Sequence, residues 1–136
     1  MNTETPLAAV HQYIDAFNRG DTNTMAKTFD VTGQILDGLP PHAWHGPTAT
    51  LDWYKDVMME SELLGATNYF VTLNDPLHNS VTNDRAYVVV PATMKFDFKG
   101  AKMVQSGAVL TMALRKTVEG WRIAAWSWAK GANANH

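Results

Sequence analysis

Apolar residues in the first sixty positions recur every three or four residues, which is the spacing of one face of a helix. In the first segment these residues are Leu7, Val10, Ile14 and Phe17. Pro6 and Gly20 mark the start and the end of this helix. A shorter helix is predicted after Asp21 and a third over residues 48–60, with a short strand over residues 33–38 between them.

From residue 67 onward, β-branched and aromatic residues dominate the chain, and clusters of turn residues interrupt them. This pattern predicts long strands over residues 68–83, 85–98, 101–116 and 121–130. Strands of this length must bend to stay compact, and Pro76, Pro91 and Gly107 lie where bends or bulges are expected. Helices followed by a meander of strands indicate an α+β fold, with a strongly curved antiparallel sheet and three N-terminal helices closing a pocket.

Length and composition limit the classes of protein to consider. The chain has 136 residues, 46% of them apolar, and a net charge of −2, which fits one globular domain over residues 1–136. We expect its core over about residues 6–130 and a frayed polar tail over residues 131–136. Without a basic excess we expect no nucleic-acid or membrane partner. The absence of cysteine and of a signal-like or membrane-spanning segment predicts a soluble, cytoplasmic protein.

An isolated aspartate and an isolated tyrosine lie among apolar residues. Asp37 ends the short strand and precedes a glycine, so it either forms a turn or an ion pair with an arginine, or faces the pocket as a general base. Arg19, Arg115 and Arg122 are the arginines considered for such a pair. Tyr13 belongs on the buried face of the first helix, where its hydroxyl either satisfies a core partner or donates to an oxyanion in the pocket.

Several further residues are candidates for contact with a substrate. His42 and His45 lie three positions apart in a proline-rich loop, where they either have a structural role, such as capping of the next helix by His45, or act at the pocket as proton donor or substrate contact. A metal site with Asp37 is the least favoured alternative, and His42 is the candidate substrate contact. His11, near the apolar edge of the first helix, is a second candidate contact. Aromatic pocket residues are predicted at Phe17, Trp53 and Tyr54. No glycine-rich phosphate loop is present, so we expect no cofactor. We expect no metal either, because a metal site usually needs ligands in a better-fixed geometry than this loop offers.

The last strand carries Trp126 and Trp128 on one face, since residues two apart in a strand share a face. That face either lines the pocket or forms the convex surface of a homodimer, and we favour the dimer. This choice turns Ala125 and Ser127 inward. On the neighbouring strand, the inward row would then be Gln105, Gly107, Val109 and Thr111.

Three segments, in this order, carry a resemblance to a known family. They are "YIDAFNRGD", "WHGPTA" and "GWRIAAWSW", and together with the order of elements they resemble the nuclear transport factor 2-like superfamily over roughly residues 6–130. That superfamily includes the SnoaL-like polyketide cyclases and the ketosteroid isomerases. The resemblance implies the cone-shaped fold, and it leaves the reaction open because many chemistries share this fold.

The resemblance to ketosteroid isomerase extends to individual residues. It implies that Tyr13 is the tyrosine that donates to the forming enolate oxygen, and that Asp37, nine residues before Gly46, is the general base. The third member of that enzyme's site is a protonated aspartic acid on a long strand, and Val109 occupies the matching place here.

These observations predict a SnoaL-like small-molecule enzyme. It would use Asp37 for cofactor-free acid–base chemistry on an apolar carbonyl compound, by isomerisation, cyclisation or dehydration. The alternative is a non-catalytic domain of the same fold that binds a small ligand or dimerises. A third hypothesis, epoxide hydrolysis, needs a second carboxylate in the cone, for which Asp84 or Asp97 would have to serve. An open cavity with an unpaired Asp37 favours catalysis, and a filled cone favours the alternative.

Overall fold

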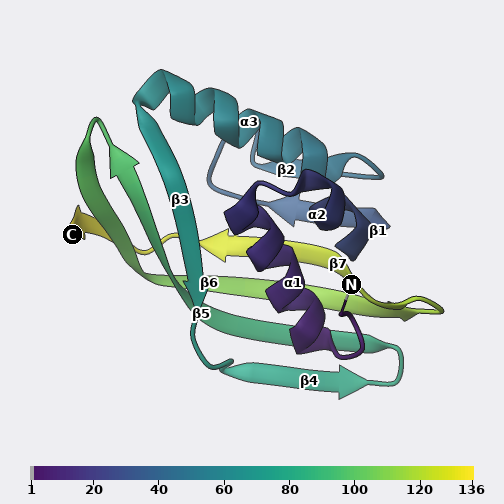
Figure 1. Ribbon diagram of the computed structural model, residues 1–136. Coiled ribbons are helices and arrows are strands. Elements are labelled where there is room, and N and C mark those ends of the chain that lie inside the picture. The colour runs from purple at the N-terminus through teal and green to yellow at the C-terminus, as the bar shows by residue number, and fades with distance from the viewer. Residues whose placement is uncertain (1) are drawn as a thin grey trace.

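Three helices lie over one large sheet in the computed structural model, which describes residues 2–136. The helices are α1 (Pro6–Arg19), α2 (Thr22–Thr28) and α3 (Ala49–Leu64). The strands are β1 (Phe29–Leu36), β2 (Ala43–His45), β3 (Ala66–Leu73), β4 (His78–Thr82), β5 (Arg85–Phe98), β6 (Ala101–Thr117), β7 (Gly120–Ala129) and β8 (Ala132–Asn135). Figure 1 shows α1 crossing the sheet while β3 and the far ends of β5 and β6 curl towards α3. The predicted α+β fold with a strongly curved sheet is confirmed.

The strand order is β2-β1-β7-β6-β5-β3, with β4 added to β5 and β8 added to β6. All pairs are antiparallel except β1 with β7, so the sheet is mixed rather than wholly antiparallel. The local pattern of β1 shows a strand but carries no information about the direction of a partner so far along the chain. The strand predicted over residues 68–83 is interrupted at residues 74–77, around Pro76, and forms β3 and β4.

The C-terminal segment is not the frayed tail that its polar sequence predicts. Residues 132–135 form β8, which pairs with residues 103–106 of β6. β8 continues the register of β7 along the same edge of β6, because Ala129 pairs with Val109 and Ala132 pairs with Ser106. An added side chain at Gly131 would collide with the backbone of Ser106, so this close approach requires glycine.

Local sequence signals set the helices against the sheet. The Thr5 side chain accepts a hydrogen bond from the Ala8 N–H at 3.1 Å and caps α1, and Gly20 ends the helix in the left-handed conformation with φ of 70°. The buried face of α1 packs on the concave side of the sheet with the aromatic and aliphatic residues of β1, β5, β6 and β7. No helix within residues 2–136 combines the length and the apolar character needed to cross a membrane.

A bulge in β6 changes which side chains face the helices. Ala92 pairs with Ala108, but Met94 pairs with Gln105, so β6 holds one extra residue near Gly107, whose φ is 75°. An extra residue reverses the alternation of side chains between the two faces. Gln105 faces inward as predicted, whereas beyond the bulge the inward residues are Ala108, Leu110, Met112 and Leu114. The predicted inward positions of Gly107, Val109 and Thr111 are therefore wrong.

A second bulge lies in β7. Ala113 pairs with Ala125 and Leu114 pairs with Ile123, which leaves Ala124 as the extra residue. Because the alternation reverses there, one face collects Trp121, Ile123, Trp126 and Trp128. The preferred interpretation, with the last two tryptophans on the convex face and Ala125 and Ser127 inward, is wrong: both tryptophans line the cavity of the cone.

Candidate active site

A cavity of about 310 Å³ lies between the helices and the concave face of the sheet. Its wall is formed by α1, α3, β3, β5, β6, β7 and the loop after β1, and most of its lining is aromatic or aliphatic. The polar or charged side chains that reach it are those of Tyr13, Asp37, Glu60, Ser61, Tyr69, Gln105 and Lys130. An apolar cavity of this size with a few polar groups has the character of a small-molecule site.

The Asp37 carboxylate lies at the wall of this cavity and is held by two N–H donors. Its Oδ1 accepts from the Gly38 N–H at 2.8 Å, and its Oδ2 accepts from the Trp53 indole N–H at 2.8 Å. The loop braces its backbone: the His42 carbonyl accepts from the Asp37 N–H, and the His42 Nδ1–H donates to the Asp37 carbonyl at 3.1 Å. A carboxylate has about four acceptor positions, so lone pairs remain for a substrate.

Within residues 2–136, Asp37 forms no ion pair. The arginines considered as its partners are bound to other acids. Arg19 pairs with Asp21 at 3.4 Å, Arg115 with Asp30 at 2.9 Å and Arg122 with Glu119 at 3.8 Å. Asp37 does cap the turn at Gly38, as one interpretation predicted, and at the same time it lines an open cavity.

The Tyr13 hydroxyl is deeper and is part of a hydrogen-bonded chain. It accepts from the Trp126 indole N–H at 3.0 Å and shares a hydrogen bond of 2.9 Å with the Thr50 hydroxyl. Burial raises the pKa of Tyr13 above its ordinary value, although both hydrogen bonds act to lower it. The hydroxyl therefore keeps its proton at neutral pH. When Thr50 is the donor, the Tyr13 O–H is free to donate into the cavity that it lines.

Two indoles connect the aspartate and the tyrosine. The rings of Trp53 and Trp126 meet edge to face, with centroids 4.9 Å apart and planes at 90°. Trp53 donates to Asp37 and Trp126 donates to Tyr13, so each indole orients one polar group while both form the apolar wall between them. The arrangement provides a base, a neutral donor and a desolvated surface for a flat ligand.

The remaining predicted contact residues divide into two groups. Phe17, Trp53 and Gln105 line the cavity, as expected. Tyr54 packs edge-on against Phe17 at 6.2 Å behind the cavity wall. Val109 faces away from the cavity because of the β6 bulge, and Leu110 lines it instead.

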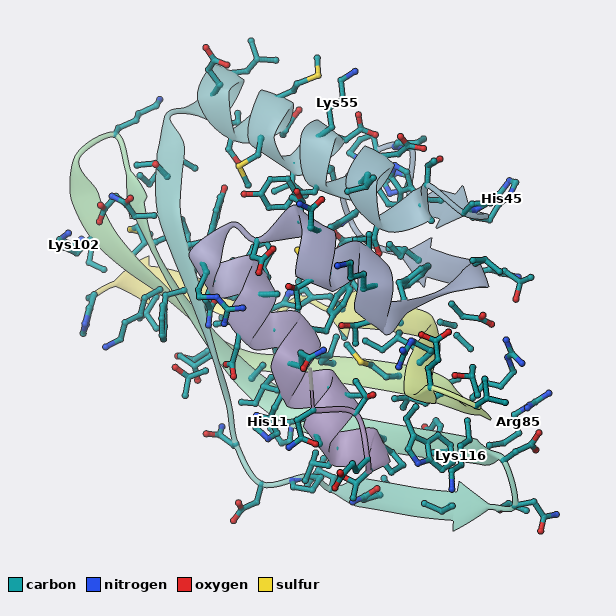
Figure 2. The ribbon with its side chains drawn as sticks, turned by 45° about the vertical axis from the view of Figure 1, so that its right-hand side comes forward. His11, His45, Lys55, Arg85, Lys102 and Lys116 are labelled. Atoms are coloured by element: carbon teal, nitrogen blue, oxygen red, sulfur yellow. The ribbon has the colours of Figure 1, made fainter. Side chains whose placement is uncertain are left out.

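The histidines do not reach the cavity. His11 is two positions from Tyr13 and so lies on the opposite side of α1, exposed to solvent (Figure 2). His42 is exposed and braces the loop. His45 is exposed at the end of β2 (Figure 2). Neither His11 nor His42 lines the cavity, so the structure does not place these two histidines where the predicted substrate contacts would lie. In the part of the chain that the structure describes, no three histidine, aspartate or glutamate side chains cluster as metal ligands would.

Further polar residues of the cavity, on α3 and β3, were not predicted from the sequence. The Ser61 hydroxyl donates to the Val57 carbonyl at 2.6 Å, so the Tyr69 hydroxyl is the donor in its 2.7 Å contact with Ser61. Glu60 is the second carboxylate of the cavity. The candidates for that role, Asp84 and Asp97, pair instead with Arg85 and Lys102 outside it. Helical spacing could have indicated Glu60 and Ser61, since both lie two turns after Trp53 on the same face of the helix.

A family model described as a SnoaL-like domain matches residues 7–128. No curated protein matches the chain.

Solved structures share the fold at low sequence identity. Hexachlorocyclohexane dehydrochlorinase LinA-type3 from Novosphingobium barchaimii superposes with a TM-score of 0.79 at 10% identity, over 96% of this chain and 90% of that one. A ketosteroid isomerase-like protein from Erwinia carotovora atroseptica gives a TM-score of 0.69 at 20% identity, over 90% and 91%. A nuclear transport factor 2-like superfamily protein from Salmonella enterica gives 0.74 at 14%, over 91% and 87%. These similarities show a shared fold.

Proposed function

This chain belongs to the family of SnoaL-like domains, and from that premise we propose that it is a cofactor-free enzyme that moves a proton at a carbon next to a carbonyl group. Its substrate is a small, largely apolar ring compound. One observation carries the proposal: the Asp37 carboxylate is oriented by two N–H donors, has no cation partner within residues 2–136, and lines an open apolar cavity.

Asp37 acts as the base in this proposal. A carboxylate oxygen takes the proton from the carbon, and the electron pair of the C–H bond moves towards the carbonyl oxygen to give an enolate. Return of the proton to another carbon completes an isomerisation, and loss of a leaving group from the neighbouring carbon completes an elimination. Both outcomes balance without a redox partner.

Tyr13 stabilises the oxygen on which the charge develops. Its hydroxyl is neutral, and the N–H of Trp126 and the O–H of Thr50 can both donate to it, which makes its own proton a stronger donor. A donor fixed in an apolar cavity contributes about 3 kcal/mol to the transition state. Phe17 and Trp53, whose ring centroids are 5.7 Å apart, keep the reacting end away from water.

The names of proteins with this fold agree with such chemistry. A dehydrochlorinase removes hydrogen together with chlorine, and a ketosteroid isomerase shifts a proton between carbons. Both reaction types begin with a proton on carbon. The alternative, a non-catalytic domain that binds a small ligand, uses the same cavity, and only turnover separates the two.

Proton exchange in heavy water provides the test without knowledge of the natural substrate. We propose 2-tetralone, an enolisable bicyclic ketone, with NMR detection of deuterium entering next to the carbonyl. Exchange above the buffer rate that depends on Asp37 supports the enzyme. Binding without exchange favours the alternative.

We also propose a homodimer through the convex face of the sheet, in the reducing environment of the cytoplasm. The tryptophans of β7 are not part of this convex face. Its exposed residues include Leu36, Tyr87 and Ala113. Tyr87 and Ala125 flank Ala113 in register on the neighbouring strands, so Ala113→Arg places a charge in the middle of that face. Sedimentation equilibrium should give a dimer for the wild type and a monomer for the variant.

A further inference from the structure

The carboxamide of Gln105 is held in one orientation at the cavity wall. Its side chain is on β6, only 6% of the residue is exposed, and its Oε1 accepts two hydrogen bonds. The donors are the Trp128 indole N–H at 2.9 Å and the Gly131 backbone N–H at 3.1 Å. Because both partners can only donate, the atom that they contact must be the amide oxygen.

The amide nitrogen of Gln105 is consequently left as an open donor. Within residues 2–136, its Nε2 has no acceptor, whereas every fully buried side-chain nitrogen or oxygen has a partner. The nitrogen is therefore in contact with solvent, and the cavity that Gln105 lines is the solvent space that it faces. An acceptor atom of a ligand in the cavity can therefore replace water as the partner of this nitrogen.

This donor lies across the cavity from the proposed base. Asp37 follows β1, Gln105 belongs to β6, and β7 runs between these two strands with Trp128 on its cavity face. Neighbouring strands are about 4.8 Å apart, so Asp37 and Gln105 start from strands that are roughly 10 Å apart across the sheet. The register adds an offset along the strands, because Leu36 pairs with Ser127 whereas Gln105 pairs with Asn133. The two side chains can therefore contact well-separated atoms of one ligand.

We propose that Gln105 is the specificity-determining hydrogen-bond donor of the cavity. Its ligand is an apolar ring compound with a second acceptor oxygen, a carbonyl, ether or hydroxyl oxygen, at the end opposite the carbon that Asp37 attacks. This inference rests on the proposed function only in assuming that Asp37 reacts with the other end of the ligand. A ligand without this oxygen would cover the Gln105 N–H groups and leave them unpaired, which disfavours its binding.

A purely structural role for Gln105 makes a different prediction. If the side chain served only to accept from Trp128 and Gly131, glutamate would serve as well, because a carboxylate accepts both bonds in the same place. Gln105→Glu therefore keeps the internal contacts and removes the open donor. Gln105→Met removes both, and it shows whether a change seen in Gln105→Glu comes from the new charge.

The test compares two ketones that differ in one acceptor. Dissociation constants of 2-tetralone and 6-methoxy-2-tetralone are measured by calorimetry for the wild type, Gln105→Glu and Gln105→Met, with thermal unfolding as the check on folding. We expect the methoxy compound to bind the wild type about tenfold more tightly. In both variants the preference should disappear, because neither side chain offers an N–H group to the methoxy oxygen.

Equal affinity of the two ketones for the wild type, a preference retained in Gln105→Glu, or no binding of either ketone would each overturn the inference. Proton exchange separates it from the proposed function. If the affinity preference depends on Gln105 but 2-tetralone does not exchange, the inference on Gln105 is supported and the proposed reaction is contradicted. If 2-tetralone exchanges but no such preference is found, the proposed reaction is supported and the inference on Gln105 is contradicted.

Discussion

The indole N–H of Trp53 donates to the Asp37 carboxylate over 2.8 Å, and this contact joins α3 to the loop after β1. Trp44 makes the same type of bond to Asp56 at 2.9 Å, outside the cavity. The chain therefore contains two buried tryptophans that each donate to an aspartate, of which only one borders the proposed site.

Trp53→Phe should reduce the rate of proton exchange at saturating ketone by about tenfold, because a hydrogen bond to a charged group is lost and the carboxylate is less well oriented. Ketone affinity should change much less, since the aromatic surface remains. Trp44→Phe is the matched control and should leave exchange unchanged. Equal losses in the two variants would show that stability, rather than orientation of Asp37, was measured.

Tyr13→Phe should lower the exchange rate about a hundredfold by removing the donor to the enolate oxygen. It should also reduce the free energy of unfolding by about 1–3 kcal/mol, because Trp126 and Thr50 lose their shared partner. Tyr69→Phe removes a hydroxyl from another part of the cavity wall and serves as the control. Wild-type exchange by a folded Tyr13→Phe protein would exclude the proposed role.

The β6 bulge predicts that truncating two adjacent side chains lowers stability by very different amounts. Leu110 is 1% exposed and lines the cavity, so Leu110→Ala should reduce the free energy of unfolding by about 2–5 kcal/mol. Val109 is partly exposed on the other face, and Val109→Ala should cost less than about 1 kcal/mol. Urea unfolding of both variants measures the difference, and the reverse order would contradict this register.

Acid should weaken the fold through Asp30. Its carboxylate accepts from the Arg115 Nη2 at 2.9 Å and Nε at 3.2 Å, and the Arg115 guanidinium holds the pKa of Asp30 below its ordinary value. A carboxyl with a lowered folded-state pKa contributes stability above its unfolded pKa of about 3.9 and loses it as pH falls through the folded value.

Asp30→Asn should therefore cost about 2 kcal/mol of unfolding free energy at pH 7, and the difference from wild type should shrink below about pH 4. Denaturant unfolding across pH 2–7 provides the measurement. Asp84→Asn removes an exposed pair and should change stability by less than about 0.5 kcal/mol. A difference between Asp30→Asn and wild type that is the same at every pH would rule out this linkage.

Much of this arrangement could be predicted from sequence because it depends on local patterns. Helical spacing placed Tyr13 and Phe17 on the buried face of α1, and the lone aspartate at the end of an apolar strand identified Asp37. The inward residues of β6 and β7 could not be predicted by counting, because a single extra residue in each strand reverses its two faces. The open donor of Gln105 depends on the hydrogen bond from the Gly131 N–H, and local patterns do not relate Gly131 to β6.

The central claim is that Asp37 removes a proton from carbon, and the most direct test compares its two candidate carboxylates. Deuterium incorporation into 2-tetralone is followed by NMR for the wild type, Asp37→Asn and Glu60→Gln, with the buffer rate subtracted and thermal unfolding measured for each. We predict exchange by the wild type and by Glu60→Gln, and loss of the protein-dependent rate in Asp37→Asn. A folded Asp37→Asn protein that exchanges as fast as the wild type, or a wild type that does not exceed buffer, would contradict the account.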